Sequence, residues 1–399
     1  MEKPLTRVAI ITSALLLAAS SLHGQVDSPP FDGENLTGDK GILFWTPEQQ
    51  IYGYSRMSEL YPTRPITGNT TPSALPVNLS KLDGFTYAFA GAGHTVDSHM
   101  HDLRTAGLLV IHNGNIKVER YGLSHHPDAP WVSFSITKSV VSMLFGAALK
   151  DGAIQSLNDS VSDYLPVFAN SSYAEVTIEQ ILQMASGVAW NEDYADPASN
   201  IVNLPSEQET GFRYMGNLPR VAEPGKVFNY NTGETNIAGA ILRKAIGQNL
   251  SAYAAETIFL PGGLSDTANW LLDAPEGDEF AGCCISANLR DYGRIGLFAL
   301  NNSKRDVSNS TLSPGWMKQA ASPSAGYEGY GYFWWLDDNG GFSAQGVFGQ
   351  YILVDPNQDL VIVLQSAWPA AWDSALEEQT LTFIEELARY VTAQESLGG

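Results

Sequence analysis

Strand-type patterns occur near both ends of this 399-residue chain and are separated by a long stretch of helical patterns, which limits the folds open to it. Two apolar runs on either side of Asn113-Gly114, a strong turn signal, predict a β-hairpin over residues 107–121. Near the other end, strands are predicted at Tyr330–Leu336, Val347–Val354 and Leu360–Gln365. A last helix is predicted from about Asp373 to Ala393.

Residues 135–300, between these strands, show helical spacing and almost no alternation. Examples are Thr177–Met184, Thr235–Ile246, Ala252–Phe259 and Leu289–Leu300. The simplest arrangement is an α/β (α+β) fold in which an antiparallel sheet from both chain ends, flanked by helices, lies beside a mostly helical lobe. We therefore expect one domain over residues 25–399, with 25–134 and 301–399 in the sheet-containing part and 135–300 in the helical lobe. A site would lie in the cleft between them.

The first 24 residues have the features of an export signal. Lys3 and Arg7 precede an apolar run from Val8 to Ala19, which is too short for a permanent membrane span. Residues 22–24 form an imperfect cleavage site, so an uncleaved anchor is the alternative. No later stretch predicts a membrane helix. We expect a periplasmic or secreted protein whose mature form does not enter a membrane.

The charge and the cysteines exclude several classes of function. A formal net charge of −21 argues against nucleic acid or an anionic membrane surface as a partner. The only cysteines, Cys283 and Cys284, are adjacent, and a bond between neighbours is strained, so we expect two small buried apolar side chains. His99-x-His101 could bind zinc, but a solvated loop is the better interpretation without further ligands. We expect no metal and no organic cofactor.

All seven histidines precede Ser135, and no Gly-x-Ser-x-Gly motif is present. An α/β-hydrolase needs its histidine after the nucleophile, so this order excludes that class. Ser135-Ile136-Thr137-Lys138 instead begins an apolar helix that ends at Asp151-Gly152. Residues at positions i and i+3 share a helix face, and a desolvated lysine there can take the serine proton. The alternative is a helix N-cap serine followed by a solvated lysine.

Two later segments could complete such a site. Tyr230, on a polar loop directly before a helix, can relay a proton to a leaving group if the charge of the lysine lowers its pKa. The alternative is a tyrosine buried beneath a turn. The segment Gly346–Gln350 opens the middle C-terminal strand, where the N–H groups of Gln350 and Ser135 could form an oxyanion hole. The alternative there is a β-bulge.

These three elements, in this order, resemble the penicillin-recognising serine hydrolases: class C type β-lactamases, DD-peptidases, family VIII esterases and nylon-oligomer hydrolases. The resemblance covers roughly residues 100–395 and is greatest to the 6-aminohexanoate-dimer hydrolase branch. Gly187–Ser199 is similar to the mobile substrate loop of that branch, Gly282–Gly296 to its helical signature and Gly41–Gln49 to its N-terminal segment.

The resemblance implies a β-lactamase/transpeptidase-like fold with Ser135 as nucleophile, Lys138 as base and Tyr230 as proton relay. Thr232 stands where many relatives have Asn or Ser, and Tyr194 matches a tyrosine that contacts the substrate amide. The acidic residue that binds the substrate amine in that branch has no clear counterpart, and Glu207 is only a weak candidate. Trp190, Trp334 and Trp335 are further candidates for pocket walls, with ordinary core packing as the alternative.

One departure from the family pattern concerns the substrate carboxylate. β-Lactamases and DD-peptidases bind it with a Lys/His-Thr-Gly strand, whereas this chain has Val347-Phe348-Gly349 there and no lysine or histidine after Lys318. Loss of that charge-assisted contact costs about 1.5–3 kcal/mol. We therefore predict a serine hydrolase for small uncharged esters or amides. The alternatives are a β-lactamase or D-amino-acid peptidase, and a non-catalytic cell-wall or peptide-binding module of the same fold.

Overall fold

The computed structural model describes residue 36 and residues 41–304 and 310–398. The export signal predicted for residues 1–24 lies outside the described residues, so it stays a prediction. The described residues belong to one compact unit.

The helices and strands follow one another in a mixed order along the chain. The helices are η1 (Ile42–Phe44), α1 (Pro47–Gly53), α2 (Met57–Leu60), α3 (Val96–Asp102), α4 (Ile136–Lys150), α5 (Val161–Tyr164), η2 (Pro166–Phe168), α6 (Ile178–Leu182), α7 (Asn200–Asn203), α8 (Gln208–Gly216), α9 (Thr232–Ile246), α10 (Leu250–Ala254), η3 (Ala255–Phe259), α11 (Leu289–Lys304), α12 (Trp316–Ala320) and α13 (Ser374–Gly398). The strands are β1 (Thr63–Pro65), β2 (Tyr87–Phe89), β3 (Ala92–His94), β4 (Thr105–His112), β5 (Asn115–Tyr121), β6 (Trp131–Val132), β7 (Asn269–Leu271), β8 (Ile285–Ala287), β9 (Trp335–Leu336), β10 (Phe342–Gly346), β11 (Gln350–Asp355) and β12 (Leu360–Ser366).

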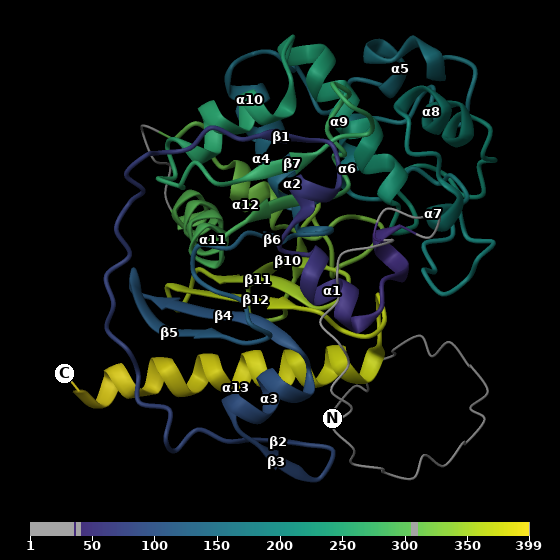
Figure 1. Cartoon of the computed structure of the whole chain (residues 1–399). Coiled ribbons are helices and arrows are strands. Elements are labelled where there is room, and N and C mark those ends of the chain that lie inside the picture. The colour runs from purple at the N-terminus through teal and green to yellow at the C-terminus, as the bar shows by residue number, and fades with distance from the viewer. Residues whose placement is uncertain (1–35, 37–40, 305–309, 399) are drawn as a thin grey trace, which may run out of the picture. The chain divides into compact units, whose positions relative to one another are not determined.

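The main sheet combines strands from both ends of the chain. Its order is β5-β4-β12-β11-β10-β9, and every neighbouring pair is antiparallel. The two ends meet where β4 pairs with β12, for example through Val110 and Ile362. The predicted fold class, an antiparallel sheet from both chain ends flanked by helices, is confirmed (Figure 1).

The predicted hairpin is β4 followed by β5, and its turn has the expected geometry. Asn113 and Gly114 have φ angles of 50° and 73°. Positive φ at both central residues is the conformation that a two-residue hairpin turn requires and that Asn-Gly favours. Every residue of β4 is buried, as is typical of a strand inside a sheet that is covered on both faces.

The strands near the C-terminus differ in part from the prediction. Leu360–Gln365 matches β12, but only Trp335–Leu336 of the first predicted segment forms a strand. The strand predicted from Val347 begins at Gln350, because residues 347–349 form the turn between β10 and β11. Phe348 and Gly349, with φ angles of 62° and 85°, are incompatible with an extended strand at that point.

A second sheet was not predicted from the sequence. Its order is β1-β7-β8-β6, and β7 and β8 lie inside the stretch expected to be helical. No strand in it exceeds three residues, which is too short for a period of two to be recognised. Its strand β6 leads directly into α4, so this sheet sets where that helix begins.

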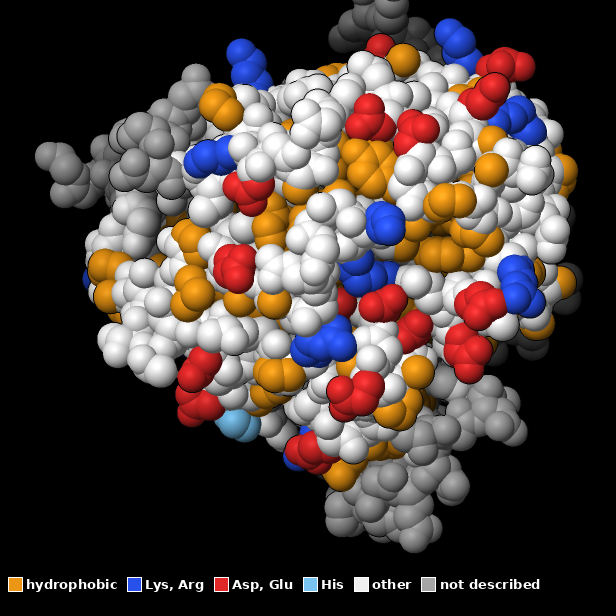
Figure 2. Space-filling model, turned by 90° about the horizontal axis from the view of Figure 1, so that it is seen from above, with side chains coloured by type: hydrophobic (Ala, Val, Ile, Leu, Met, Phe, Trp, Pro, Cys, Tyr) orange, Lys and Arg blue, Asp and Glu red, His pale blue; other side chains and the backbone are white. Residues whose placement is uncertain are grey.

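Helices cover both faces of the main sheet. In Figure 1, α13 runs along one face, and α11 and α4 lie on the other. Helices α5 to α10 lie beyond α4, whereas α4 and α11, which also fall within the predicted lobe of residues 135–300, lie on the sheet. On the face seen in Figure 2, acidic, basic and hydrophobic side chains are interspersed. No helix in the described part of the chain combines the length and apolar character that a membrane crossing requires.

His99 and His101 lie on α3 rather than on the solvated loop that the sequence suggested. His99 is buried, its ring stacks 3.7 Å from that of Phe383, and its Nδ1 lies 2.9 Å from the Tyr87 hydroxyl. Burial lowers its pKa to about 3, which is consistent with a neutral packing residue.

Candidate active site

The turn between β6 and α4 presents Ser135 at the start of a buried helix. Phe134, just before it, has a φ of 46°, a conformation that is uncommon outside glycine. Its ring packs 5.2 Å from that of Tyr54 and 5.1 Å from that of Phe348, which fixes this bend. Ser135 is the N-cap residue of α4, but its side chain makes no capping bond there. Its hydroxyl is therefore available for other contacts.

Lys138 meets Ser135 one helical turn further on. Its Nζ lies 2.8 Å from Ser135 Oγ and donates a hydrogen bond of 2.8 Å to the carbonyl oxygen of Gly282. The lysine is 1% exposed, which rules out the alternative of a solvated side chain. Burial lowers its pKa to about 8, and the negative charge of Glu192 opposes this shift. At pH 7, one unit below this pKa, about a tenth of the lysine side chains are therefore neutral amines.

Tyr230 lies on the other side of the lysine. Nζ of Lys138 is 5.1 Å from the centre of the Tyr230 ring, and this ring stacks on Trp335 at 5.8 Å. The expectation that its pKa would be lowered is wrong. Burial and the charge of Glu192 raise the pKa of Tyr230 strongly, and a hydrogen bond with Ser135 offsets only part of this. The phenol therefore keeps its proton and can act as a donor.

Glu192 joins the predicted substrate residues to one another. Its carboxylate accepts hydrogen bonds from Trp190 Nε1, from the Tyr194 hydroxyl at 2.7 Å, and from both the backbone N–H and the hydroxyl of Thr232. Sequence reasoning singled out these three neighbours but missed the glutamate. Its place between Trp190 and Tyr194 in the candidate loop was the available signal.

A second carboxylate lies beneath the first turn of α9. Glu234 is buried and accepts hydrogen bonds from Tyr173, Ser186 and Asn231. Burial raises its pKa to about 8. Asn231 also caps α9 by accepting a bond from the Glu234 N–H at 3.1 Å. This network fixes the helix start that follows Tyr230.

The turn after β10 packs against Phe134, the residue before Ser135. Phe348 is 1% exposed and packs on Phe134, and a Cβ at Gly349 would meet the Trp368 ring at 2.5 Å, so both residues face the interior. Gln350 is buried, and its side-chain amide donates to the carbonyl oxygens of Phe348 and Ser366. Val347 is the more exposed residue of this turn. An oxyanion role for the Gln350 N–H stays a prediction.

The remaining predicted residues occupy varied positions. Trp335 forms a wall beside Tyr230, whereas Trp334 is fully buried against Phe342 and belongs to the core. Trp190 is mostly buried, with its indole N–H on Glu192. Glu207 is the exposed N-cap residue of α8.

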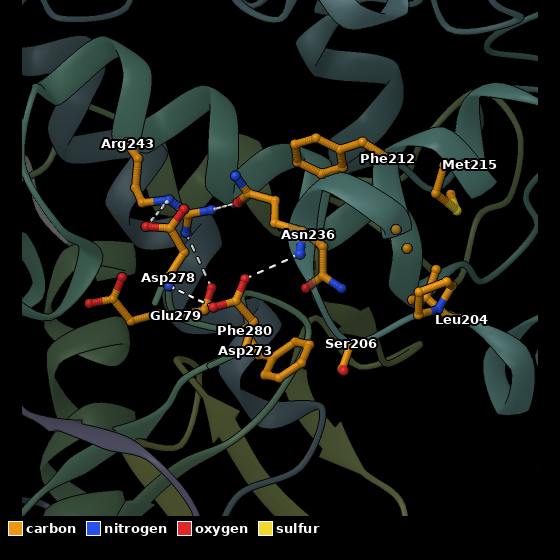
Figure 3. Close-up of a pocket in the computed structure, with 14 residues that line it drawn as sticks. Leu204, Ser206, Phe212, Met215, Asn236, Arg243, Asp273, Asp278, Glu279 and Phe280 are labelled. Carbon is orange, nitrogen blue, oxygen red and sulfur yellow. Dashed lines mark hydrogen bonds and ion pairs between the residues drawn. The ribbon is translucent and has the colours of Figure 1, made fainter. Parts of the chain in front are cut away.

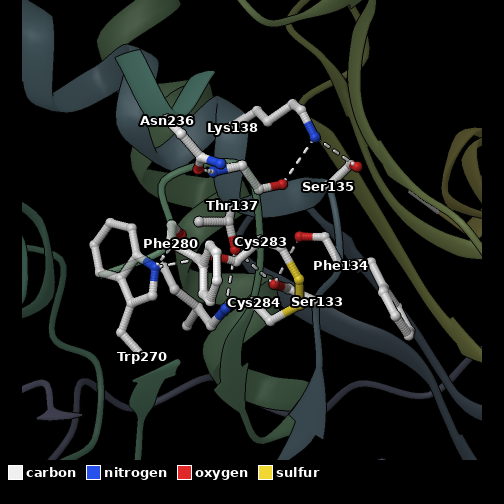
Figure 4. Close-up of a disulfide and its surroundings, with 12 residues drawn as sticks. Ser133, Phe134, Ser135, Thr137, Lys138, Asn236, Trp270, Phe280, Cys283 and Cys284 are labelled. Carbon is white, nitrogen blue, oxygen red and sulfur yellow. Dashed lines mark hydrogen bonds between the residues drawn. A yellow bond between two sulfur atoms is a disulfide. The ribbon is translucent and has the colours of Figure 1, made fainter. Parts of the chain in front are cut away.

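The segment behind the lysine contains the two cysteines. Cys283 and Cys284 form a disulfide with each other, so the expectation of two unbonded apolar side chains is wrong. The carbonyl oxygen of the adjacent Gly282 accepts a hydrogen bond from Lys138, and the Gly282 N–H donates to Asn236 Oδ1 at 3.1 Å. Figure 4 shows the amino end of Lys138 turned toward Ser135 next to this segment.

A hollow of about 380 Å³, part of it open to solvent, is lined by residues of α8, of α9 and of the segment 273–280 (Figure 3). Its lining includes Asn236, Arg243, Phe212 and Phe280, but not Ser135, Lys138 or Tyr230. We therefore do not assign the reaction to this hollow. Its connection to the site is Asn236, which lines the hollow and accepts a hydrogen bond from the Gly282 N–H. Within the described part of the chain, no group of three or more His, Cys, Asp or Glu side chains is placed to hold a metal ion.

Comparisons with known proteins agree with this geometry. A beta-lactamase family profile matches residues 93–380. A curated 6-aminohexanoate-dimer hydrolase from Paenarthrobacter ureafaciens is 25% identical over 344 residues, which cover 80% of this chain and 85% of that protein.

Solved structures share the fold. A Bacillus anthracis protein, provisionally named a 6-aminohexanoate-dimer hydrolase, has a TM-score of 0.79 at 21% identity and covers 92% of this chain and 99% of its own. EstCE1, described as a hydrolase with promiscuous acyltransferase activity, has a TM-score of 0.55 at 16% identity, with 73% of this chain and 98% of EstCE1 covered.

Proposed function

We propose that this chain, which belongs to the beta-lactamase family and is a hydrolase of that family, cleaves small uncharged esters or amides through an acyl-enzyme on Ser135. The observation on which this rests is the 2.8 Å approach of a buried lysine amine to the serine hydroxyl. A lysine with a pKa of about 8 supplies a base near neutral pH without a histidine.

The geometry supports a division of roles. Neutral Lys138 takes the proton of Ser135 as its Oγ attacks the substrate carbonyl carbon. The backbone N–H of Ser135 and one from the turn after β10, at Gln350 or the more exposed Val347, would stabilise the oxyanion. Tyr230, protonated because its pKa is raised, passes its proton to the leaving group and regains one from the Lys138 ammonium, which returns the lysine to its neutral form. Water activated by the same lysine then releases the acyl group and restores Ser135.

The charges around the site favour an uncharged substrate. Lys138 is occupied with Ser135 and Gly282, and its neighbour Glu192 is a carboxylate. The turn at residues 347–349 offers no cationic side chain to a substrate carboxylate. One relative is named a 6-aminohexanoate-dimer hydrolase and EstCE1 is described as a hydrolase with promiscuous acyltransferase activity, which supports esters and amides as the class to test. We also propose that the mature protein acts in the periplasm or outside the cell.

The test is hydrolysis of p-nitrophenyl butyrate by the wild type and Ser135→Ala. We expect Ser135→Ala to lose about a thousandfold or more in kcat/KM, because the variant lacks the hydroxyl on which the acyl-enzyme is proposed to form. Ser322→Ala, which removes the same hydroxyl from an exposed position, should match the wild type. Mass spectrometry after a fluorophosphonate should find the adduct on Ser135. Equal turnover by wild type and Ser135→Ala, or binding of esters without turnover, would exclude the proposed chemistry.

A further inference from the structure

We propose that Glu192 is a positioning residue of this active site: its carboxylate fastens the loop of residues 190–194 to the first residue of α9 and thereby holds Tyr230 against Lys138. The inference rests on the proposed function, because it assigns a task within the same site.

The hydrogen bonds of Glu192 join two segments that are about forty positions apart in the sequence. Oε1 accepts from the Tyr194 hydroxyl and from the Thr232 hydroxyl, and Oε2 accepts from Trp190 Nε1 and the Thr232 N–H. Both oxygens are thus occupied by protein donors. Such a carboxylate is poorly placed to bind a substrate amine directly, so its effect must pass through its neighbours.

The hydrogen bonds of Glu192 to Thr232 lie close in the sequence to Tyr230, one of the proposed reacting groups. Thr232 is two positions after Tyr230, whose ring faces Lys138 Nζ on one side and stacks on Trp335. A shift of the loop or of the helix start would therefore move Tyr230 relative to the amine. Since productive geometry tolerates only small displacements, such a shift should reduce kcat more than substrate binding.

The charge of Glu192 also acts on the catalytic base. It favours the ammonium form of Lys138 and opposes the effect of burial. It raises the pKa of Tyr194, Tyr230 and Tyr330, and the buried Glu234 on α9 is affected in the same direction. Lys138 is the only cation among these groups. Removing the carboxylate charge should therefore lower the pKa of Lys138 and move the acidic limb of activity to lower pH.

The experiment compares Glu192→Gln, Glu192→Asp and the control Glu223→Gln in the full chain. Glu223 is exposed, so its variant makes the same chemical change away from the site. For each protein, kcat and KM for p-nitrophenyl butyrate are measured across pH. In parallel, the pKa of Lys138 is followed by NMR of protein labelled with [13C]lysine, with Lys138→Met used to assign its signal. The NMR titration needs no turnover.

We expect Glu192→Gln to lower kcat at least tenfold with little change in KM, and to lower both the Lys138 titration point and the acidic limb by at least half a pH unit. Glu192→Asp keeps the negative charge, so its Lys138 titration point and its acidic limb should stay close to those of the wild type. Glu223→Gln should match the wild type in all of these quantities. The inference is overturned if Glu192→Gln behaves like Glu223→Gln, or if kcat falls while the lysine titration does not move. If the wild type shows no Ser135-dependent turnover, the proposed function fails, and the NMR shift still decides whether Glu192 acts on Lys138.

Discussion

Replacing Lys138 by methionine should stabilise the folded protein at neutral pH while it abolishes turnover. Burial lowers the pKa of this lysine from 10.5 to about 8, so its charged form is disfavoured in the native state. A shift of about 2.5 pH units corresponds to roughly 3 kcal/mol of lost stability at neutral pH. Methionine removes that cost but leaves the carbonyl of Gly282 without its donor, a loss of about 1 kcal/mol. The net expectation is a gain of about 2 kcal/mol.

The pH dependence separates this effect from ordinary repacking. The destabilisation by Lys138 is fully present below its folded pKa of about 8 and is relieved as pH rises toward its unfolded value of 10.5, because the unfolded chain then binds more protons than the native state. Between about pH 7 and about pH 9.5 the wild type should regain roughly 2 kcal/mol relative to Lys138→Met.

Urea unfolding followed by tryptophan fluorescence at the two pH values measures both quantities. Lys226→Met, which removes an exposed lysine, is the matched control and should change stability little at either pH. The reasoning is refuted if Lys138→Met is less stable than the wild type at neutral pH, or if the difference between them is the same at both pH values.

Two further predictions concern the surroundings of the lysine and the choice of substrate. Gly282→Ala should lower kcat for p-nitrophenyl butyrate about tenfold, because a Cβ there would lie 2.7 Å from Thr232 Cγ2 and displace the carbonyl that Lys138 binds. Gly93→Ala, where a Cβ meets nothing within 4 Å, is the control, and equal kcat values for the two variants would contradict the role of Gly282. Nitrocefin should be turned over with a kcat/KM at least about a hundredfold below that of p-nitrophenyl butyrate, because no cationic side chain at residues 347–349 meets its carboxylate. Comparable values for the two substrates would refute this.

Local signals in the sequence predicted the features that depend on neighbouring residues. Asn113-Gly114 predicted the hairpin because its turn needs positive φ at both positions, and the spacing of Ser135 and Lys138 predicted their approach because one helical turn separates them. The direction of the Tyr230 pKa could not be predicted in this way. It depends on how completely the folded chain buries the phenol and on the charge of Glu192.

Contacts between segments that are distant in the sequence could not be predicted from it. Nothing local indicates that the carbonyl of Gly282 lies 2.8 Å from the lysine amine, or that Thr232 binds Glu192. The second sheet was missed because its strands are too short to show a period. The sequence predicts a strand from Val347, whereas the left-handed φ of Phe348 makes residues 347–349 a turn.

The pairing of β4 with β12 affects how this chain is made. Until residue 366 has left the ribosome, the hairpin of residues 105–121 has no partner along the β4 edge, and the nascent polypeptide exposes a hydrophobic edge that can aggregate. The chain can therefore reach its native state only after almost all of it has been synthesised. Folding should also be slow, because contacts between residues so far apart in the sequence form late. A version ending before Leu360 should accumulate as insoluble material or be degraded, even though it retains Ser135, Lys138 and Tyr230.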